Sequence, residues 1–139
     1  MNLLTNKPLL SVDCDGVLIP NVLEEALGEY IKLSGLGTHD SSPLWTWYNE
    51  LVRSNPQELN IPLLKKLIEL KDQYYIELWT NRSYTLKDAT LKNLNGYKGV
   101  FDDFHFYSGR KHLSQREGVV IDNNERYLSC GETGILYQM

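Results

Sequence analysis

The sequence predicts an α/β protein in which a parallel β-sheet lies between two layers of helices. Apolar runs typical of buried strands alternate with segments of helical periodicity, and the strongest of these runs end directly in polar residues. Strands that alternate with helices imply right-handed crossovers and a parallel sheet. A length of 139 residues suits one domain, so residues 1–139 are expected to form a single three-layer unit.

Each expected strand is a short run of apolar, β-branched or aromatic residues. The first begins at Leu9 and breaks off at Asp13, where a turn marked by glycine and proline follows. Such a run is typical of a parallel strand buried on both faces. Further strands are expected at residues 74–79, 101–107 and 118–121, with a short fifth at 134–137.

Two helices are expected between these strands. Residues 62–71 place a broad apolar face on one helix that starts near Asn60 and Pro62, and its expected members are Leu63, Leu64, Leu67, Ile68 and Leu70. Ser83 or Thr85 can cap a second helix, which the Asn95-Gly96 pair ends.

Residues 20–56 do not fit this alternation, because they separate the first strand from the next helix by far more than an ordinary connection. Two short helices are expected within them, at 22–33 and 44–52, as a small helical insertion over the site. The aromatic residues Trp45, Trp47 and Tyr48 favour packing within this module, while stacking on a substrate ring is the alternative.

The composition narrows the class of protein. With 14 basic and 18 acidic residues the net charge is -4, which removes the global attraction on which sequence-independent nucleic-acid binders rely. No apolar stretch approaches the roughly 18 residues of a membrane span. Two cysteines, Cys14 and Cys130, are too few for a secreted disulfide scaffold, and no signal peptide is visible. A soluble, cytoplasmic protein is expected; the oligomeric state is left open.

The run Asp13-Cys14-Asp15-Gly16-Val17 is the most informative motif. Two carboxylates at the mouth of a buried strand indicate phosphate chemistry with a divalent cation, because reactive groups in open α/β sheets collect outside the carboxyl ends of the strands. The alternative is an Asp-rich turn that caps the next helix. A calcium EF-hand does not fit, because its loop needs a further oxygen ligand where this chain has Val17.

The order of polar residues along the chain resembles that of the haloacid dehalogenase superfamily, whose members are mostly phosphatases. The resemblance runs from Leu9 to Asp122, and its four stations are Asp13 with Asp15, Thr80 in Leu78-Trp79-Thr80-Asn81-Arg82, Lys111, and Asp122 in Val119-Val120-Ile121-Asp122-Asn123. It implies a Rossmann-like fold and a small phosphatase with a minimal helical cap at residues 20–56. A dehalogenase would lack the acid that this chain has at Asp15.

The resemblance also implies a role for each station. Asp13 would form an aspartyl phosphate, and Asp15 would donate a proton to the leaving oxygen and later deprotonate water. Asp13, Asp122 and the backbone carbonyl of Asp15 would hold Mg²⁺. Thr80 and Asn81 would hold phosphate oxygens; this turn taken alone favours a helix cap, and its place after a buried strand favours the phosphate role.

The third and fourth stations depart from the pattern. Lys111 would neutralise charge on the transferring phosphoryl group, but Arg110 and His112 compete for this role, with Lys98 more distant. Asn123 stands where many relatives carry a second acid, so it is expected to contact a metal-bound water without adding charge. His39 and His105 have no ligand spacing and are read as structural or surface residues.

The predicted function is therefore a Mg²⁺-dependent phosphoric monoester hydrolase that acts on a small phosphorylated metabolite or nucleotide. One alternative is a phosphatase that processes nucleic-acid ends carrying a 3′-phosphate. Another is a non-catalytic module that binds phosphate or metal on the same scaffold.

Overall fold

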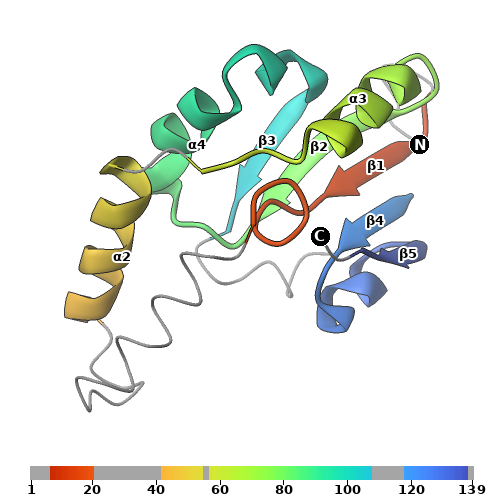
Figure 1. Ribbon diagram of the computed structural model, residues 1–139. Helices are drawn as coiled ribbons and strands as arrows, with labels where there is room; N and C mark the ends of the chain where they lie inside the picture. Colours follow the sequence, from red (N-terminus) through yellow and green to blue (C-terminus); the bar gives the residue numbers. More distant parts are fainter. Residues whose placement is uncertain (1–6, 21–41, 55–56, 108–117, 138–139) are drawn as a thin grey trace.

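The computed structural model describes residues 7–20, 42–54, 57–107 and 118–137, and within 42–48 only the side chain of Thr46 (Figure 1). Five parallel strands form one sheet in the order β3-β2-β1-β4-β5. They are β1 (Leu9–Val12), β2 (Tyr75–Thr80), β3 (Asp103–Phe106), β4 (Val119–Asp122) and β5 (Thr133–Leu136). All five expected strands are confirmed, with ends that differ by one or two residues.

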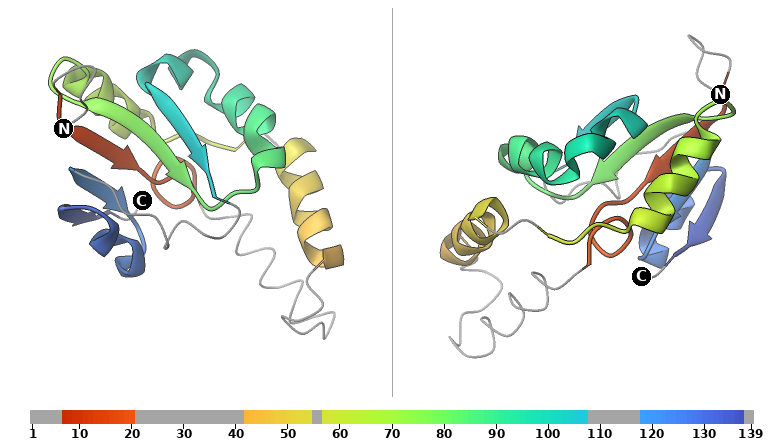
Figure 2. Two further views of the ribbon diagram at one scale, coloured as in Figure 1. Left: turned by 180° about the vertical axis from the view of Figure 1, so that it is seen from behind. Right: turned by 45° about the horizontal axis from the view of Figure 1, so that its top comes forward.

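The strand order places β1 at the centre, with β2 and β4 on its two sides. Helix α3 (Ile61–Leu70) joins β1 to β2, and α4 (Lys87–Leu94) lies between β2 and β3. Both connections run in the same direction across the sheet, so right-handed crossovers bring both helices to one face. From behind, the strands lie in front of α3 (Figure 2). The connection from β4 to β5 runs in the opposite direction and contains the 3₁₀ segment η5 (Glu125–Cys130).

The core lies between the sheet and α3. Leu10 and Val12 of β1 and Ile76 of β2 pack with Leu64 and Leu67 of α3 in one buried cluster. Burial of each such side chain stabilises the fold by about 1.5–3 kcal/mol. Every strand that reaches the site is therefore anchored in the same core.

Helix α3 begins as expected but buries a narrower face. The Asn60 side chain caps it by accepting a hydrogen bond from the Leu63 N–H at 3.2 Å. Only Leu64 and Leu67 are fully buried in the helix, and Ile68 is 48% exposed, so its expected place on the core face is wrong. A helix that meets a sheet on one side buries mainly the positions three residues apart that face it.

The second expected helix has two parts. Ser83 caps a 3₁₀ turn, η2 (Tyr84–Leu86), by accepting a hydrogen bond from the Thr85 N–H at 3.3 Å, and α4 follows. The α-helix ends at Asn95, whose φ of 47° lies in the left-handed region, and the 3₁₀ segment η3 (Asn95–Val100) continues to β3. Of the two candidate caps, Ser83 makes the bond.

The described part of the insertion is α2 (Ser42–Ser54), which confirms the helix expected at 44–52. It lies near the start of η2, where Arg53 Nη2 is 3.5 Å from the Thr85 carbonyl oxygen. The helix expected at 22–33 and the side chains of Trp45, Trp47 and Tyr48 lie outside the described residues. None of the helices in the described ranges is long and apolar enough to cross a membrane.

Candidate active site

The turn after β1 is wound around a single carbonyl group. The Cys14 oxygen accepts hydrogen bonds from the N–H groups of Val17, Leu18 and Ile19 at 3.2, 2.9 and 3.1 Å. Gly16, with a φ of +83°, provides the left-handed conformation that this turn needs and that other residues adopt only at a cost. The winding leaves Asp13 buried at the strand end and turns Asp15 out to the edge of the sheet, 15% exposed.

Asp13 and Asp122 end neighbouring strands. The β1–β4 register pairs Val12 with Ile121, and the Asp13 N–H continues this ladder by donating to the Ile121 carbonyl at 2.9 Å. The next position along β4 is Asp122, so the two aspartates lie at matching positions on strands about 4.8 Å apart. Asp122 is fully buried, and its Oδ1 accepts a hydrogen bond from the Asn124 N–H at 3.0 Å.

Thr80 ends β2, on the other side of β1. Its Oγ1 accepts a hydrogen bond from the Arg82 N–H at 3.1 Å, which leaves the hydroxyl hydrogen to be donated elsewhere. The Asn81 side chain follows and donates from Nδ2 to the Tyr127 hydroxyl at 2.7 Å. Tyr127 belongs to η5, so this bond ties the end of β2 to the connection between β4 and β5.

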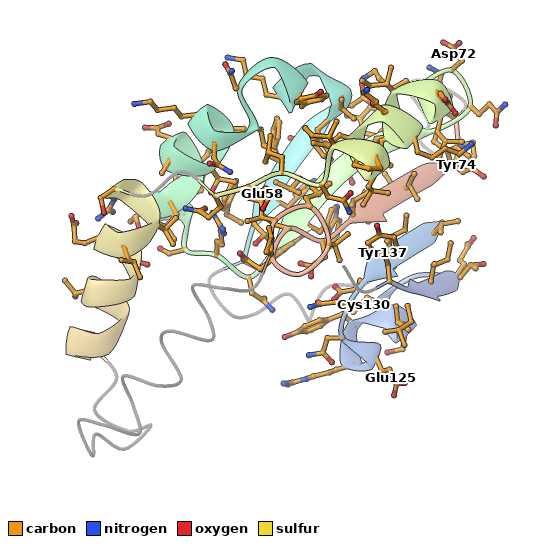
Figure 3. The ribbon with its side chains drawn as sticks, viewed as in Figure 1. Glu58, Asp72, Tyr74, Glu125, Cys130 and Tyr137 are labelled. Atoms are coloured by element: carbon orange, nitrogen blue, oxygen red, sulfur yellow. The ribbon has the colours of Figure 1, made fainter. Side chains whose placement is uncertain are left out.

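These strand ends surround a cavity of about 440 Å³. Its described lining is Asp13, Asp15, Thr80, Asn81, Asn123, Asn124, Glu125 and Tyr127. Glu125 lies on η5 (Figure 3). Three of these lining residues are acidic, and none is a lysine or arginine, so an anion that enters needs positive charge from another source. Asp122 is not among the described residues that line the cavity.

Arg82 makes a two-pronged ion pair with Asp15. Its Nε donates to Asp15 Oδ2 at 3.0 Å and its Nη2 to Asp15 Oδ1 at 2.7 Å. The arginine side chain is only 2% exposed. Two more contacts hold the guanidinium, from Nη1 to Thr90 Oγ1 at 3.0 Å and from Nη2 to Gln57 Oε1 at 3.4 Å. The Arg82 charge is thus paired with the carboxylate of Asp15.

The structure brings together Asp13, Asp15, Thr80, Asn81 and Asn123 around one cavity, with Asp122 beside Asp13. Lys111, together with its competitors Arg110 and His112, lies outside the described residues. Lys98 was a wrong candidate, because it lies in η3 directly before the amino end of β3, whereas the cavity is at the carboxyl ends of the strands.

Sequence reasoning missed the parts played by Arg82 and Tyr127. Arg82 stands in the quoted motif after Thr80 and Asn81, and that position was the one available signal. For Tyr127 the sequence offers no signal, because its partner Asn81 is 46 residues away.

A separate trio of potential metal ligands lies on β2 and β3, away from the cavity lining: Glu77, Asp103 and His105, whose ligand atoms lie within 4.8 Å of one another. His105 Nε2 is 2.9 Å from Glu77 Oε2, and the Trp79 indole N–H donates to Glu77 Oε1 at 3.0 Å. His105 thus contacts the carboxylates of Glu77 and Asp103, and its expected role as a structural or surface residue stays a prediction. The same acidic region lies near Tyr75, whose pKa is raised above 10.0 by burial first and then by the neighbouring carboxylates.

Solved structures share this fold. A haloacid dehalogenase-like hydrolase from Streptococcus pneumoniae has a TM-score of 0.63 and 14% identity, covering 87% of this chain and 78% of that one. A subfamily IA hydrolase of the same superfamily from Geobacter sulfurreducens has a TM-score of 0.55 and 20% identity, covering 89% and 84%. The RNA polymerase II CTD phosphatase of fission yeast has a TM-score of 0.54 and 14% identity, covering 94% of this chain and 42% of that one.

No protein-family model and no curated protein sequence matches the chain. At sequence identities of 20% and below, structural similarity shows a shared fold and does not identify a particular reaction. The parallel sheet, its strand order and these solved structures together show that the chain has the fold of the haloacid dehalogenase superfamily.

Proposed function

We propose that this protein is a Mg²⁺-dependent phosphatase that hydrolyses phosphate monoesters through an aspartyl phosphate on Asp13. The observation that carries the proposal is the cavity at the carboxyl ends of β1 and β2, which Asp13, Asp15 and Thr80 all line. The fold supports it, since it is shared with the phosphatase from fission yeast.

The donor set suits a hard cation. Asp13 and Asp122, with the backbone carbonyl of Asp15, would supply oxygen ligands only, which is the preference of Mg²⁺. The described cavity wall is acidic, so a cation is needed before a phosphate can approach. When bound, Mg²⁺ supplies positive charge that offsets the repulsion between Asp13 and the phosphoryl group. Asn123 contributes an amide in place of a second acid, so metal affinity is expected to be modest.

Two displacements then follow on this chain's own residues. A carboxylate oxygen of Asp13 attacks phosphorus, and the bond to the leaving oxygen breaks. Thr80 donates its hydroxyl hydrogen to a non-bridging phosphate oxygen, and Asn81, held by Tyr127, lines the same wall. Water then attacks phosphorus, the bond to Asp13 breaks, and Asp15 takes the proton of the water.

The proposed substrate is a small phosphorylated metabolite or nucleotide. The cavity volume of about 440 Å³ falls within the range of small-molecule sites. The net charge of -4 opposes a long polyanion as the principal ligand. In the same proposal, the whole chain acts as one cytoplasmic domain, residues 20–56 form its cap, and Lys111 provides the remaining phosphate contact.

Hydrolysis of a panel of phosphate esters tests the proposal. The panel contains 4-nitrophenyl phosphate, nucleoside monophosphates, sugar phosphates and 3′-phosphorylated oligonucleotides, each with Mg²⁺ and with EDTA. We expect Mg²⁺-dependent release of phosphate that is abolished in Asp13→Asn. The matched control is Asp72→Asn, an exposed aspartate in the turn between α3 and β2 (Figure 3).

Two results would contradict the proposal: no ester is hydrolysed by the parent protein, or Asp13→Asn keeps the parent's rate. A preference for oligonucleotides, with binding that weakens steeply as salt is added, would instead favour the end-processing activity.

A further inference from the structure

We propose that Arg82 is a positioning residue that holds the Asp15 carboxylate ready to accept a proton from the water that attacks phosphorylated Asp13. The inference rests on the proposed function and assigns a role to a residue outside the cavity lining. It predicts that loss of Arg82 slows the release of phosphate from the enzyme and leaves formation of the aspartyl phosphate largely intact.

Arg82 holds Asp15 in a fork of two hydrogen bonds. Both oxygens of Asp15 accept an N–H of Arg82, at 3.0 and 2.7 Å. A guanidinium is planar and presents its N–H donors in a fixed fork, so the two bonds set the plane of the carboxylate. The fork therefore fixes the directions in which the remaining lone pairs of Asp15 point.

Asp15 keeps room for a water molecule beside this fork. A carboxylate offers about four lone-pair positions, of which the fork occupies two. The Asp15 side chain is 15% exposed and lines the same cavity as Asp13. A water molecule between the two aspartates can therefore donate to Asp15 while its oxygen faces the phosphorus atom bound to Asp13.

Arg82 is itself held in place by further contacts. Its side chain is 2% exposed, and Thr90 of α4 accepts from Nη1 at 3.0 Å. Gln57, which precedes α3, accepts from Nη2 at 3.4 Å. Contacts from two further parts of the fold thus fix the guanidinium plane, and the plane fixes the orientation of the carboxylate. An exposed salt bridge would not have this effect, because its side chains are free to rotate.

The proton balance assigns the effect to the second displacement. With 4-nitrophenyl phosphate the bond from phosphorus to the phenol oxygen breaks, the electron pair leaves with 4-nitrophenolate, and no proton is needed. In the second displacement the water oxygen binds phosphorus, the bond to Asp13 breaks, and the water proton passes to Asp15. A displaced Asp15 consequently slows only this second half, and a misplacement of about 1 Å can cost about a hundredfold in rate.

Rapid-mixing kinetics with 4-nitrophenyl phosphate and Mg²⁺ test the proposal. We expect Arg82→Met to release a stoichiometric burst of 4-nitrophenolate and then to turn over about a hundredfold more slowly than the parent. Arg82→Lys should lie between them, because an ammonium cannot form the fork. The matched control is Lys66→Met on α3, an exposed lysine paired with Glu69, which should behave as the parent.

A double-variant comparison separates positioning from a structural role. If Arg82 acts through Asp15, the variant Asp15→Asn with Arg82→Met is no slower than Asp15→Asn with Arg82 intact. Should Arg82→Met fail to fold, Arg82→Lys and the isosteric Thr90→Val carry the test, each with a retained burst and a slower second phase.

Different outcomes overturn different claims. Equal loss of burst and turnover in the Arg82 variants, or a double variant far slower than Asp15→Asn, overturns the positioning role. A parent enzyme that turns over, together with Arg82 variants at the parent's rate, overturns it as well and leaves the proposed function standing. A parent that hydrolyses no ester removes both.

Discussion

Gly118 stands directly before β4, and its replacement by alanine tests how tightly the two site-bearing strands are joined. Its φ is +86°, and an added Cβ would lie 2.1 Å from the carbonyl oxygen of Leu9, the first residue of β1. The left-handed conformation costs an alanine about 1–2 kcal/mol. The contact is with backbone, so β1 or β4 must shift to relieve it.

The expected loss of stability can be added up from these two effects. A shift that weakens one or two hydrogen bonds of the β1–β4 ladder costs a further 0.5–1.5 kcal/mol for each, so the free energy of unfolding should fall by about 1.5–5 kcal/mol. At a urea dependence of about 2 kcal/mol/M, the midpoint of unfolding would fall by about 0.8–2.5 M. The readout is urea unfolding followed by tryptophan fluorescence and by circular dichroism.

Gly96→Ala is the matched control. Gly96 lies in η3, where an added Cβ meets no atom within 4 Å, and its φ is outside the left-handed region. This change is expected to alter stability by less than about 1 kcal/mol, in the stabilising direction. Equal midpoints for the two variants would refute the reasoning from close approach at Gly118.

Three further predictions follow from other parts of the structure. Asn60→Ala removes the cap of α3 and the two hydrogen bonds that Asn60 Nδ2 donates, to the Val17 carbonyl at 3.0 Å and to the Tyr137 hydroxyl at 2.8 Å. Thermal unfolding should show a loss of stability of about 2–3 kcal/mol, and Asn60→Asp, which can still cap the helix, should lose less. In a thermal-shift titration, Asp122→Asn should abolish the stabilisation of the folded protein by Mg²⁺, and it should raise the Mg²⁺ concentration needed for hydrolysis. If the variant is stabilised by Mg²⁺ as the parent is, Asp122 is not a metal ligand. The pKa of Tyr75 is raised in the fold, so above pH 10.0 the folded protein keeps a proton that the unfolded chain loses, and stability should fall as the pH rises above 10.0. Tyr75→Phe should make the urea midpoint fall less steeply with pH. An identical fall in the variant would assign the pH dependence to other groups.

Local pattern predicted most of the fold. A parallel strand buried on both faces needs a continuous apolar run, and a polar residue that follows such a run must lie at the sheet edge. Hence the positions of Asp13, Thr80 and Asp122 at strand ends could be read directly from the sequence, and the register of β1 with β4 agrees with them. The caps at Asn60 and Ser83 were also predictable, because a cap acts within three residues.

The sequence pattern was less informative about the burial and the partners of side chains, because these depend on how the helices and strands pack. Ile68 shares the helical face of Leu64 and Leu67 in the sequence, yet it is half exposed, because the area that the sheet covers is set by the angle and position of α3. Glu77 reads as a polar residue in an apolar strand, and only the fold shows that Trp79 and His105 satisfy its carboxylate.

The sequence by itself determined the order of strands and helices and the residues at the strand ends, because these depend on neighbours a few positions away. Only the tertiary structure decided the partners of those residues: Arg82 on Asp15 across 67 positions, and Tyr127 on Asn81 across 46. Such pairs depend on which strands lie side by side and on the turns after them. A one-dimensional pattern carries no distance between segments so far apart. For that reason the acidic pair after the first strand could be predicted, and the arginine that pairs with Asp15 could not.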